Sequence, residues 1–551
     1  MPYHVMEHLD ATKARVNKGA AAGVTELLAR VTGRFYTPAD IGEPLIEELV
    51  HDALAAFPAN APIRVIDPFC GDGRLISWLI YAANKERTDD RIRLDVHLWD
   101  CDRLAVSTAA KNVKAALVDC GMQGTVTKLD GDTFIQAANY HSAFDLVVTN
   151  PPWDRLKPDA RETSALSRNT AEAHRRWLKS HSKLLASLYP WSVPSRRYAG
   201  WGINLARCGV ELALTLVRPH GWCALVSPAS LFADQVSAPL RQWIFRRFAV
   251  RRIAYFSAEA RLFDNVDQPA ATFTVQAVPP HGAAAVRVYD RSLNFRDFRI
   301  DPSLAAVNTG YTLPIHGPME CLDLLERSSR LPKFSSLELD PAARLWAGRE
   351  LDETRHKYLL RSRGARPFVK GRMVGRFELL EKPDRFVAEA PDISLPGSVS
   401  HARLVWRDVS RPTQMRRMYA ALIPPRWVTG NSLNVAYFPI ECKKLLKVLL
   451  AVINSLAFEL HIRALSATAH VSLGTVRQAA VPDIHERSFV KRMEPLVQRR
   501  LQGEHATEPE LEALVARAYG FNQADFDLLL SGFPKLTSDY RALLRDAFAR
   551  V

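Results

Sequence analysis

The chain has 551 residues, 47% of them hydrophobic and 24% charged, so its length predicts two or three globular domains. Its net charge of +14 favours a polyanionic partner, although charge alone is a weak signal. The sequence lacks an apolar run of the roughly 20 residues that span a bilayer, and its start lacks a signal-peptide pattern. Seven scattered cysteines without a CxxC pair argue against a disulfide framework or a zinc site. These features predict a cytoplasmic protein without a membrane segment.

The first part of the chain is expected to be helical. Residues 1–32 are rich in alanine and predict an N-terminal helical extension, which the segment GRFYTP at residues 33–38 interrupts. A second helix is predicted over residues 38–57, because apolar residues such as Leu45 and Leu49 recur at helical spacing.

Strands and helices then alternate. Buried strands are expected at residues 63–67, 94–100, 126–130 and 144–149. Helices are expected between them at residues 75–84 and 104–119. The same pattern returns with a helix at residues 203–217 and strands at residues 222–227, 252–256 and 272–278. Strands separated by helices of 10–15 residues imply a parallel, doubly wound α/β sheet, and the Pro-Pro-His-Gly turn at residues 279–282 marks its expected edge.

Residues 154–200 and the second half of the chain do not follow this pattern. Residues 154–200 are polar and basic, and a connection of that length is usually functional or disordered. Beyond residue 300, arginine and aromatic residues interleave, at residues 370–372, 376–377, 406–407, 411, 416–417 and 426–427. An apolar helix is predicted over residues 445–460, and a small helical cap follows from Pro509 to the end.

Acidic residues and glycines follow the first strands. Asp67 ends the first strand, and Gly71 and Gly73 then open a helix and allow a ligand to approach the backbone closely. The spacing is not GxGxxG, and no P-loop lysine follows, so neither NAD nor ATP is favoured. An acid in place of a phosphate-binding group suits a cationic ligand with an amino group. Asp100 is placed to bind ribose hydroxyls and Asp132 an adenine amino group, although a single such acid is more often a helix cap or a turn residue.

Asn150-Pro151-Pro152-Trp153 follows the fourth strand. The two prolines have no N–H, so this backbone is stiff and presents only carbonyl acceptors. The Asn150 side chain adds another acceptor, and Trp153 adds a broad π-face. Two acceptors beside a stacking platform suit the amino group of an adenine or cytosine that has left its stack. On these four residues alone, a plain Pro-Pro turn is an equally good interpretation.

In this order the motifs resemble those of the N6-adenine, amino-group DNA methyltransferases, especially the restriction-modification enzymes with FYTP and NPP[YFW] motifs. The resemblance covers residues 33–280 and is looser over residues 400–485. It implies a Rossmann-like methyltransferase domain over residues 33–300, with residues 154–200 as a basic loop insertion. A mixed α+β target-recognition domain over residues 301–485 and a C-terminal helical segment over residues 486–551 would follow.

The resemblance implies S-adenosylmethionine as the cofactor and no metal. The residues assigned to the cofactor are Tyr36, Thr37, Pro38, Asp67, Phe69, Cys70, Gly71, Gly73, Asp100, Cys101, Asp132, Thr133, Asn150 and Pro152. The residues assigned to catalysis are Asn150, Pro151, Pro152 and Trp153. The Asn150 side chain and the Pro151 carbonyl would bind the adenine N6 while Trp153 stacks on the flipped base. Phe69, in place of the usual small residue, and the long segment after Trp153 depart from the family pattern.

The implied substrate is double-stranded DNA. The basic second half is expected to contact phosphates and bases, with Lys370, Arg372 and Arg407 as candidates, and the loop at residues 154–200 is expected to clamp DNA. A fused nuclease is not apparent, so a separate restriction nuclease or another defence-system subunit is the expected partner. Methylation of RNA, of protein glutamine or of cytosine N4 stays open as an alternative. So does a DNA-recognition or sensor subunit that catalyses little.

Overall fold

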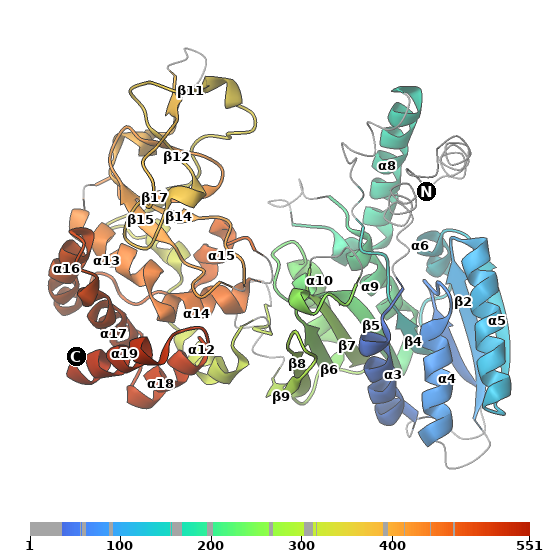
Figure 1. The fold of residues 1–551 in the computed structure, drawn as a ribbon. Helices are drawn as coiled ribbons and strands as arrows, with labels where there is room; N and C mark the ends of the chain where they lie inside the picture. Colours follow the sequence, from blue (N-terminus) through green and yellow to red (C-terminus); the bar gives the residue numbers. More distant parts are fainter. Residues whose placement is uncertain are drawn as a thin grey trace. The chain divides into compact units, whose positions relative to one another are not determined.

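The computed structural model describes residues 36–54, 57, 62–86, 92–154, 156, 168–195, 202–263, 268–301, 312–315, 317–388, 395–412, 414–440, 442–466 and 469–551. The chain divides into two compact units, Met1–Ala306 and Val307–Val551 (Figure 1). The helix predicted over residues 1–32 lies outside the described residues, as do Phe35 and residues 196–198.

The first unit contains a nine-stranded sheet with the order β3-β2-β1-β4-β5-β7-β6-β8-β9. Its strands are β1 (Ile63–Asp67), β2 (Arg93–Asp100), β3 (Gln123–Asp130), β4 (Phe144–Thr149), β5 (Val217–Pro228), β6 (Ala249–Phe256), β7 (Ala270–Gln276), β8 (Ala284–Tyr289) and β9 (Phe295–Ile300). Strands β1 to β5 pair in parallel, whereas β7 is antiparallel to both of its neighbours, β5 and β6. The predicted Rossmann-like α/β fold is therefore confirmed, but a wholly parallel sheet was a wrong expectation.

Helices cover this sheet and form its core. The helices of this unit are α3 (Ala39–Ala53), α4 (Arg74–Glu86), α5 (Arg103–Asp119), α6 (Thr133–Gln136), α8 (Arg168–Leu188), α9 (Leu205–Leu216) and α10 (Ala238–Arg247), of which α8 extends away from the sheet (Figure 1). Apolar side chains of α3, α4 and α5 share one core with the strands, and α9 packs on β4 and β5. All six residues of β4 are buried, as expected for a parallel strand that is covered on both faces. The sheet therefore holds the residue after β4 in a rigid position.

Two expectations for this unit need correction. The sheet does not end at residues 279–282, because β8 pairs with β6 and β9 pairs with β8. Strand β9 has the sequence FRDFRI and is mostly exposed, so it lacks the apolar run that identifies a buried strand. Residues 154–200 are not simply a loop, since they contain the 21-residue helix α8. Leu178 and Leu185 are buried on α8 at helical spacing, a signal that its many charges obscured.

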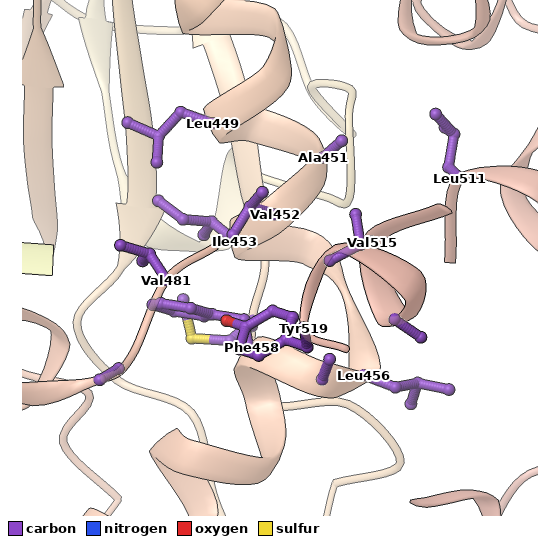
Figure 2. Close-up of a cluster of buried hydrophobic side chains, with 14 of the residues drawn as sticks. Leu449, Ala451, Val452, Ile453, Leu456, Phe458, Val481, Leu511, Val515 and Tyr519 are labelled. Atoms are coloured by element: carbon purple, nitrogen blue, oxygen red, sulfur yellow. The ribbon is translucent and has the colours of Figure 1, made fainter. Parts of the chain in front are cut away.

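The second unit is mixed α+β. Its four-stranded sheet has the order β10-β17-β14-β15, formed by Trp346–Gly348, Leu433–Tyr437, Arg403–Arg407 and Ala420–Ile423. Two smaller pairs are β11 (Leu360–Arg361) with β13 (Phe386–Val387), and β12 (Phe368–Val369) with β16 (Val428–Thr429). Its helices are α12 (Leu322–Ser328), α13 (Lys443–Asn454), α14 (Leu456–Leu465), α15 (Leu473–Gln478), α16 (Arg487–Leu501), α17 (Glu508–Ala518), α18 (Gln523–Ser531) and α19 (Ser538–Arg550). One apolar core joins this sheet to the helices, and Figure 2 shows α13 residues such as Ile453 within it.

The apolar helix predicted over residues 445–460 is two helices, α13 and α14, which meet at an angle of 60°. Ser455 separates them, because its extended backbone ends α13 and its side-chain oxygen accepts a hydrogen bond from the Phe458 N–H at the start of α14. Within the described residues, no single helix is long and apolar enough to cross a membrane. Among the described helices, only the bent pair α13 and α14, taken together, has the length and apolar composition of a membrane span.

Candidate active site

Asp67 lies at the carboxyl end of β1 and is only 1% exposed. Its Oδ1 atom accepts hydrogen bonds from the Thr149 hydroxyl at 2.7 Å and from the Phe69 N–H at 3.1 Å. Burial raises the pKa of Asp67 to about 7, although both hydrogen bonds act in the opposite direction. A buried carboxylate without a basic partner among its hydrogen bonds is placed to bind a cationic group.

The turn between β1 and α4 requires its glycines. Gly71 and Gly73 have φ values of +51° and +80°, in the left-handed region that glycine adopts without strain. A Cβ atom on Gly73 would lie 2.9 Å from the Ala109 backbone, so α5 packs directly against this turn. Asp100 holds the turn from the end of β2, because its Oδ2 atom accepts a hydrogen bond from the Gly71 N–H at 3.0 Å. Burial also raises the pKa of Asp100.

The described residues of the FYTP motif lie against the same turn. A Cβ atom on Gly71 would come within 3.2 Å of the Tyr36 ring. The Arg74 guanidinium lies 4.9 Å from the centre of that ring and donates a hydrogen bond to the Thr37 carbonyl at 2.9 Å. Pro38 occupies the N-cap position of α3. Arg74 was not singled out from the sequence, although it directly follows the glycine turn and joins it to the start of α3.

Asn150 connects the turn after β4 to this cluster. Its Nδ2 atom donates a hydrogen bond to the Thr37 hydroxyl at 3.1 Å, and its Oδ1 atom accepts one from the Trp153 indole N–H, also at 3.1 Å. A carbonyl oxygen has two lone pairs, so Oδ1 is able to accept a second hydrogen bond. The Trp153 side chain is half-buried, with its ring 4.9 Å from that of Phe263. The amide is therefore held in one orientation beside an aromatic ring.

Pro151 is buried against Gly209 of α9. A Cβ atom at position 209 would lie 2.2 Å from Pro151 Cβ and 3.3 Å from the Phe69 ring, so a larger residue does not fit without movement. Gly209 is a residue that the sequence interpretation missed, since nothing in the sequence marks a contact across 58 positions. Pro152 is half-buried, so the prolines differ in their surroundings.

Asp132 precedes α6 and caps it, because its Oδ1 atom accepts a hydrogen bond from the Phe134 N–H at 3.0 Å. Its other oxygen lies 3.7 Å from Nε2 of His181 on α8. Thr133, next to it, is buried. Cys70 is buried with its backbone N–H bonded to the Trp99 carbonyl, and burial raises the pKa of its thiol. Cys101 follows Asp100 and is exposed.

The three candidate DNA-binding residues differ in their surroundings. Lys370 is paired with Glu353, and the Arg407 guanidinium donates a hydrogen bond to the Val374 carbonyl at 2.6 Å. Arg372 is the most exposed of the three, although it pairs with two exposed acids, Glu381 and Asp384. Their contact with DNA stays a prediction.

The interpretation of the interleaved arginine and aromatic residues as one DNA-facing surface is wrong for several of them. Trp406, Arg416 and Arg417 are each no more than 2% exposed. Arg416 lies between Glu459 and Glu512, each 2.9 Å from its guanidinium, which compensates for the burial of the charge. These residues are part of the interior of the second unit and are not available to a ligand.

In the first unit, β7 is inserted antiparallel between β5 and β6, acidic residues end β1 and β2, and the NPPW segment follows β4. Residues 24–180 match the model of the N-6 DNA methylase family. The resemblance expected from the sequence is thereby confirmed for this part of the chain. Among curated proteins, none matches the chain in sequence.

Solved structures of restriction-modification enzymes are similar to the chain. The type IIL enzyme MmeI in complex with DNA has a TM-score of 0.50 at 10% identity, over 90% of this chain and 75% of that chain. A nuclease-deletion mutant of the type ISP enzyme LlaGI, in complex with a DNA substrate mimic, has a TM-score of 0.48 at 11% identity. The match covers 85% of this chain and 47% of that chain. The type IIG restriction endonuclease BpuSI has a TM-score of 0.42 at 11% identity, and the match covers 97% of this chain and 70% of that chain. The likeness to MmeI concerns the fold.

Proposed function

We propose that the protein is a site-specific DNA methyltransferase that transfers a methyl group from S-adenosylmethionine to the N6 amino group of adenine in double-stranded DNA. The observation that carries this proposal is the hydrogen-bonded link from Asn150 to Thr37, which Arg74 continues to the glycine turn. This link places a side-chain amide and an indole beside a turn that is suited to a nucleoside ligand. The proposed setting is the cytoplasm, as the modification component of a restriction-modification or phage-defence system.

The residues of the turn fit S-adenosylmethionine. Asp67 offers a buried carboxylate for the amino group of the methionine part, and the glycines allow close approach of the ligand. Asp100 accepts one backbone hydrogen bond at each carboxylate oxygen, from Gly71 and Asp102, so each oxygen keeps a lone pair for a ribose hydroxyl. Asp132 is assigned to the adenine amino group. When bound, the cofactor supplies an electrophilic methyl group.

Asn150, Pro151 and Trp153 are proposed to bind a flipped adenine. The lone pair of N6 is delocalised into the ring, so this nitrogen is a poor nucleophile until hydrogen bonds to the Asn150 side chain and the Pro151 carbonyl draw it toward tetrahedral geometry. Stacking on Trp153, worth roughly 1–3 kcal/mol, would help offset the unstacking of the base. Catalysis would then rest mainly on positioning, because no covalent intermediate on the protein is needed.

The proposed DNA contacts come from both units. Arg372 in the second unit and the basic side chains of α8 in the first are the exposed candidates, and their affinity for phosphates would fall with rising salt concentration. A separate restriction nuclease or another defence-system subunit is the proposed protein partner.

The reaction product tests the proposal directly. After incubation with labelled S-adenosylmethionine and mixed-sequence duplex DNA, we expect digestion of the DNA to nucleosides to yield labelled N6-methyldeoxyadenosine. Label in N4-methyldeoxycytidine, or transfer of label only when RNA or protein is offered in place of the duplex, would overturn the assignment to adenine in DNA. Binding of the cofactor and DNA without transfer would instead identify a recognition or sensor subunit.

Replacement of Asp100 by alanine is expected to weaken cofactor binding about tenfold or more, because hydrogen bonds to a charged group contribute roughly 1.5–3 kcal/mol. Calorimetric titration with S-adenosylhomocysteine measures this change. Asp119→Ala, at the exposed end of α5, is the matched control and should bind as the parent protein does. Unchanged affinity in Asp100→Ala would contradict the ribose-binding role.

A further inference from the structure

Helix α8 is anchored to the loop that carries Asp132. Just after α8, the Tyr189 hydroxyl donates a buried hydrogen bond of 2.6 Å to the Phe134 carbonyl on α6. The rings of these two residues lie 5.9 Å apart, and the Phe134 ring lies 5.1 Å from that of Phe69 in the β1–α4 loop. The two departures from the family pattern, Phe69 and the long segment after Trp153, therefore meet at Phe134.

Glu211 of α9 fixes the segment that follows α8. Its carboxylate accepts hydrogen bonds from the backbone N–H groups of Trp191, at 3.2 Å, and Ser192, at 2.7 Å. The Ser192 hydroxyl donates a third bond, also at 2.7 Å. From this fixed end, α8 extends beyond the helices around it (Figure 1). A change in the orientation of α8 would therefore be transmitted to the loop that carries Asp132, through the hydrogen bond from Tyr189 to Phe134.

One side of α8 faces Asp132. His181 lies 3.7 Å from the Asp132 carboxylate and is stacked on Trp177, with their ring centres 4.8 Å apart and their planes 13° apart. Trp177 continues the stack to His174, at 6.1 Å. Burial lowers the pKa of His181 below its usual value, although the neighbouring Asp132 carboxylate acts in the opposite direction. His181 therefore lies beside the Asp132 carboxylate and is held there by an aromatic stack.

The other side of α8 is exposed and basic. It carries Arg175, Arg176, Lys179 and Lys183, with Glu172 as an exposed acid on the same helix. Arg175, Lys179 and Lys183 follow each other at intervals of four residues and so share one face. Within the described part of the chain, none of these four basic side chains forms an ion pair with an acid, unlike the arginines buried in the second unit. This face suits a polyanion.

We propose that α8 couples DNA binding to cofactor binding, with His181 as a positioning residue for Asp132. The exposed face of α8 binds DNA phosphates, and this binding favours one orientation of α8. In that orientation His181 stays beside Asp132, the residue assigned to the adenine of the cofactor. This inference rests on the proposed function and adds its regulation. Because coupling between two ligands is reciprocal, DNA raises cofactor affinity by the same factor by which the cofactor raises DNA affinity.

Two binding measurements on the full chain test this coupling. Calorimetry gives the affinity for S-adenosylhomocysteine with and without a mixed-sequence duplex, and fluorescence anisotropy gives the affinity for the duplex with and without S-adenosylhomocysteine. In the parent protein we expect each ligand to strengthen the other about fivefold or more, with equal factors. Lys179→Ala with Lys183→Ala should weaken DNA binding but leave cofactor affinity without DNA unchanged. The matched control is Lys111→Ala with Lys114→Ala, which removes the same charge from the exposed side of α5.

Two variants at position 181 separate the polar contact from the stack. His181→Phe keeps a ring on Trp177 but loses Nε2, the atom that lies 3.7 Å from the Asp132 carboxylate, so cofactor affinity should fall by up to about fivefold and the coupling factor should approach one. His181→Gln supplies a side-chain N–H donor without a ring, so it should restore part of the cofactor affinity and part of the coupling factor. If the phenylalanine variant does not fold, the glutamine variant is compared with the parent protein instead. Independent binding of the two ligands by the parent protein, or parent-like coupling in His181→Phe, would overturn the inference and leave the proposed function standing. A parent protein that binds no S-adenosylhomocysteine would remove the proposed function and this inference together.

Discussion

Asn150→Ala is expected to lower the rate of methyl transfer at least about 100-fold, in the range found when one preorganised hydrogen-bonding group is removed from an active site. The substitution removes the acceptor that is proposed to bind the target amino group, and it leaves the Trp153 indole N–H without its present partner. Asp67, Asp100 and the glycine turn are untouched, so the affinity for S-adenosylhomocysteine should change little. Single-turnover kinetics with duplex DNA, together with calorimetry, measure the two quantities separately.

Thr37→Val is the control for this experiment. It removes the hydroxyl that orients the Asn150 amide but keeps the amide itself, so a smaller loss, about tenfold, is expected from one neutral hydrogen bond. Near-normal turnover in Asn150→Ala would refute the assignment of Asn150 to the target base. A loss of cofactor binding as large as the loss of turnover would show that Asn150 supports the cofactor turn through Thr37 instead.

The strand ends were predictable from the sequence because each is a local signal. Strand β4 is six consecutive residues that the structure buries completely, and the NPPW segment follows it directly. Asp67 and Asp100 likewise stand at the ends of apolar strands. In a parallel sheet such ends meet at one edge, so residues that were chosen separately come together.

Contacts between distant residues were not predictable. Arg74 bonds the Thr37 carbonyl across 37 positions, and His181 lies beside Asp132 across 49 positions. Neither contact can be inferred from the periodicity or the composition of a single sequence. The NPPW segment was found from its own residues, whereas the groups that orient it were found only in the structure.

The buried arginines of the second unit show the limit of reading charge from a sequence. Arg416 was taken as part of a basic surface, but its partners Glu459 and Glu512 lie 43 and 96 positions away. A charged residue is buried only when such partners are brought to it, and burial then hides it from any ligand. A net charge of +14 therefore does not state where the charge lies.

Asp67→Asn is expected to abolish useful cofactor binding while stabilising the protein in the absence of ligand. Asparagine keeps an oxygen that accepts the hydrogen bonds from Thr149 and Phe69 but lacks the charge. The removal of one partner from a buried, hydrogen-bonded charge pair costs about 2–5 kcal/mol, so the affinity for S-adenosylhomocysteine should fall at least about 30-fold. Calorimetry measures this loss, and Asp119→Asn on the exposed end of α5 is the matched control.

The predicted gain in stability depends on pH with a definite sign. The folded-state pKa of Asp67 is raised to about 7 from its ordinary 3.8, so between these values the folded protein holds a proton that the unfolded chain has released. The free energy of unfolding contributed by Asp67 therefore decreases as pH rises from about 4 to 7, and the full cost, on the order of a few kcal/mol, is present above pH 7. Asp67→Asn should raise the melting temperature at pH 8 but not at pH 4.

Protonation of Asp67 should also weaken cofactor binding. The affinity of the parent protein for the cofactor should fall as pH drops below about 7, by up to about tenfold per pH unit. A variant that is no more stable than the parent at pH 8, or a parent affinity that does not change between pH 8 and pH 5.5, would contradict a buried, charged Asp67 at the cofactor site.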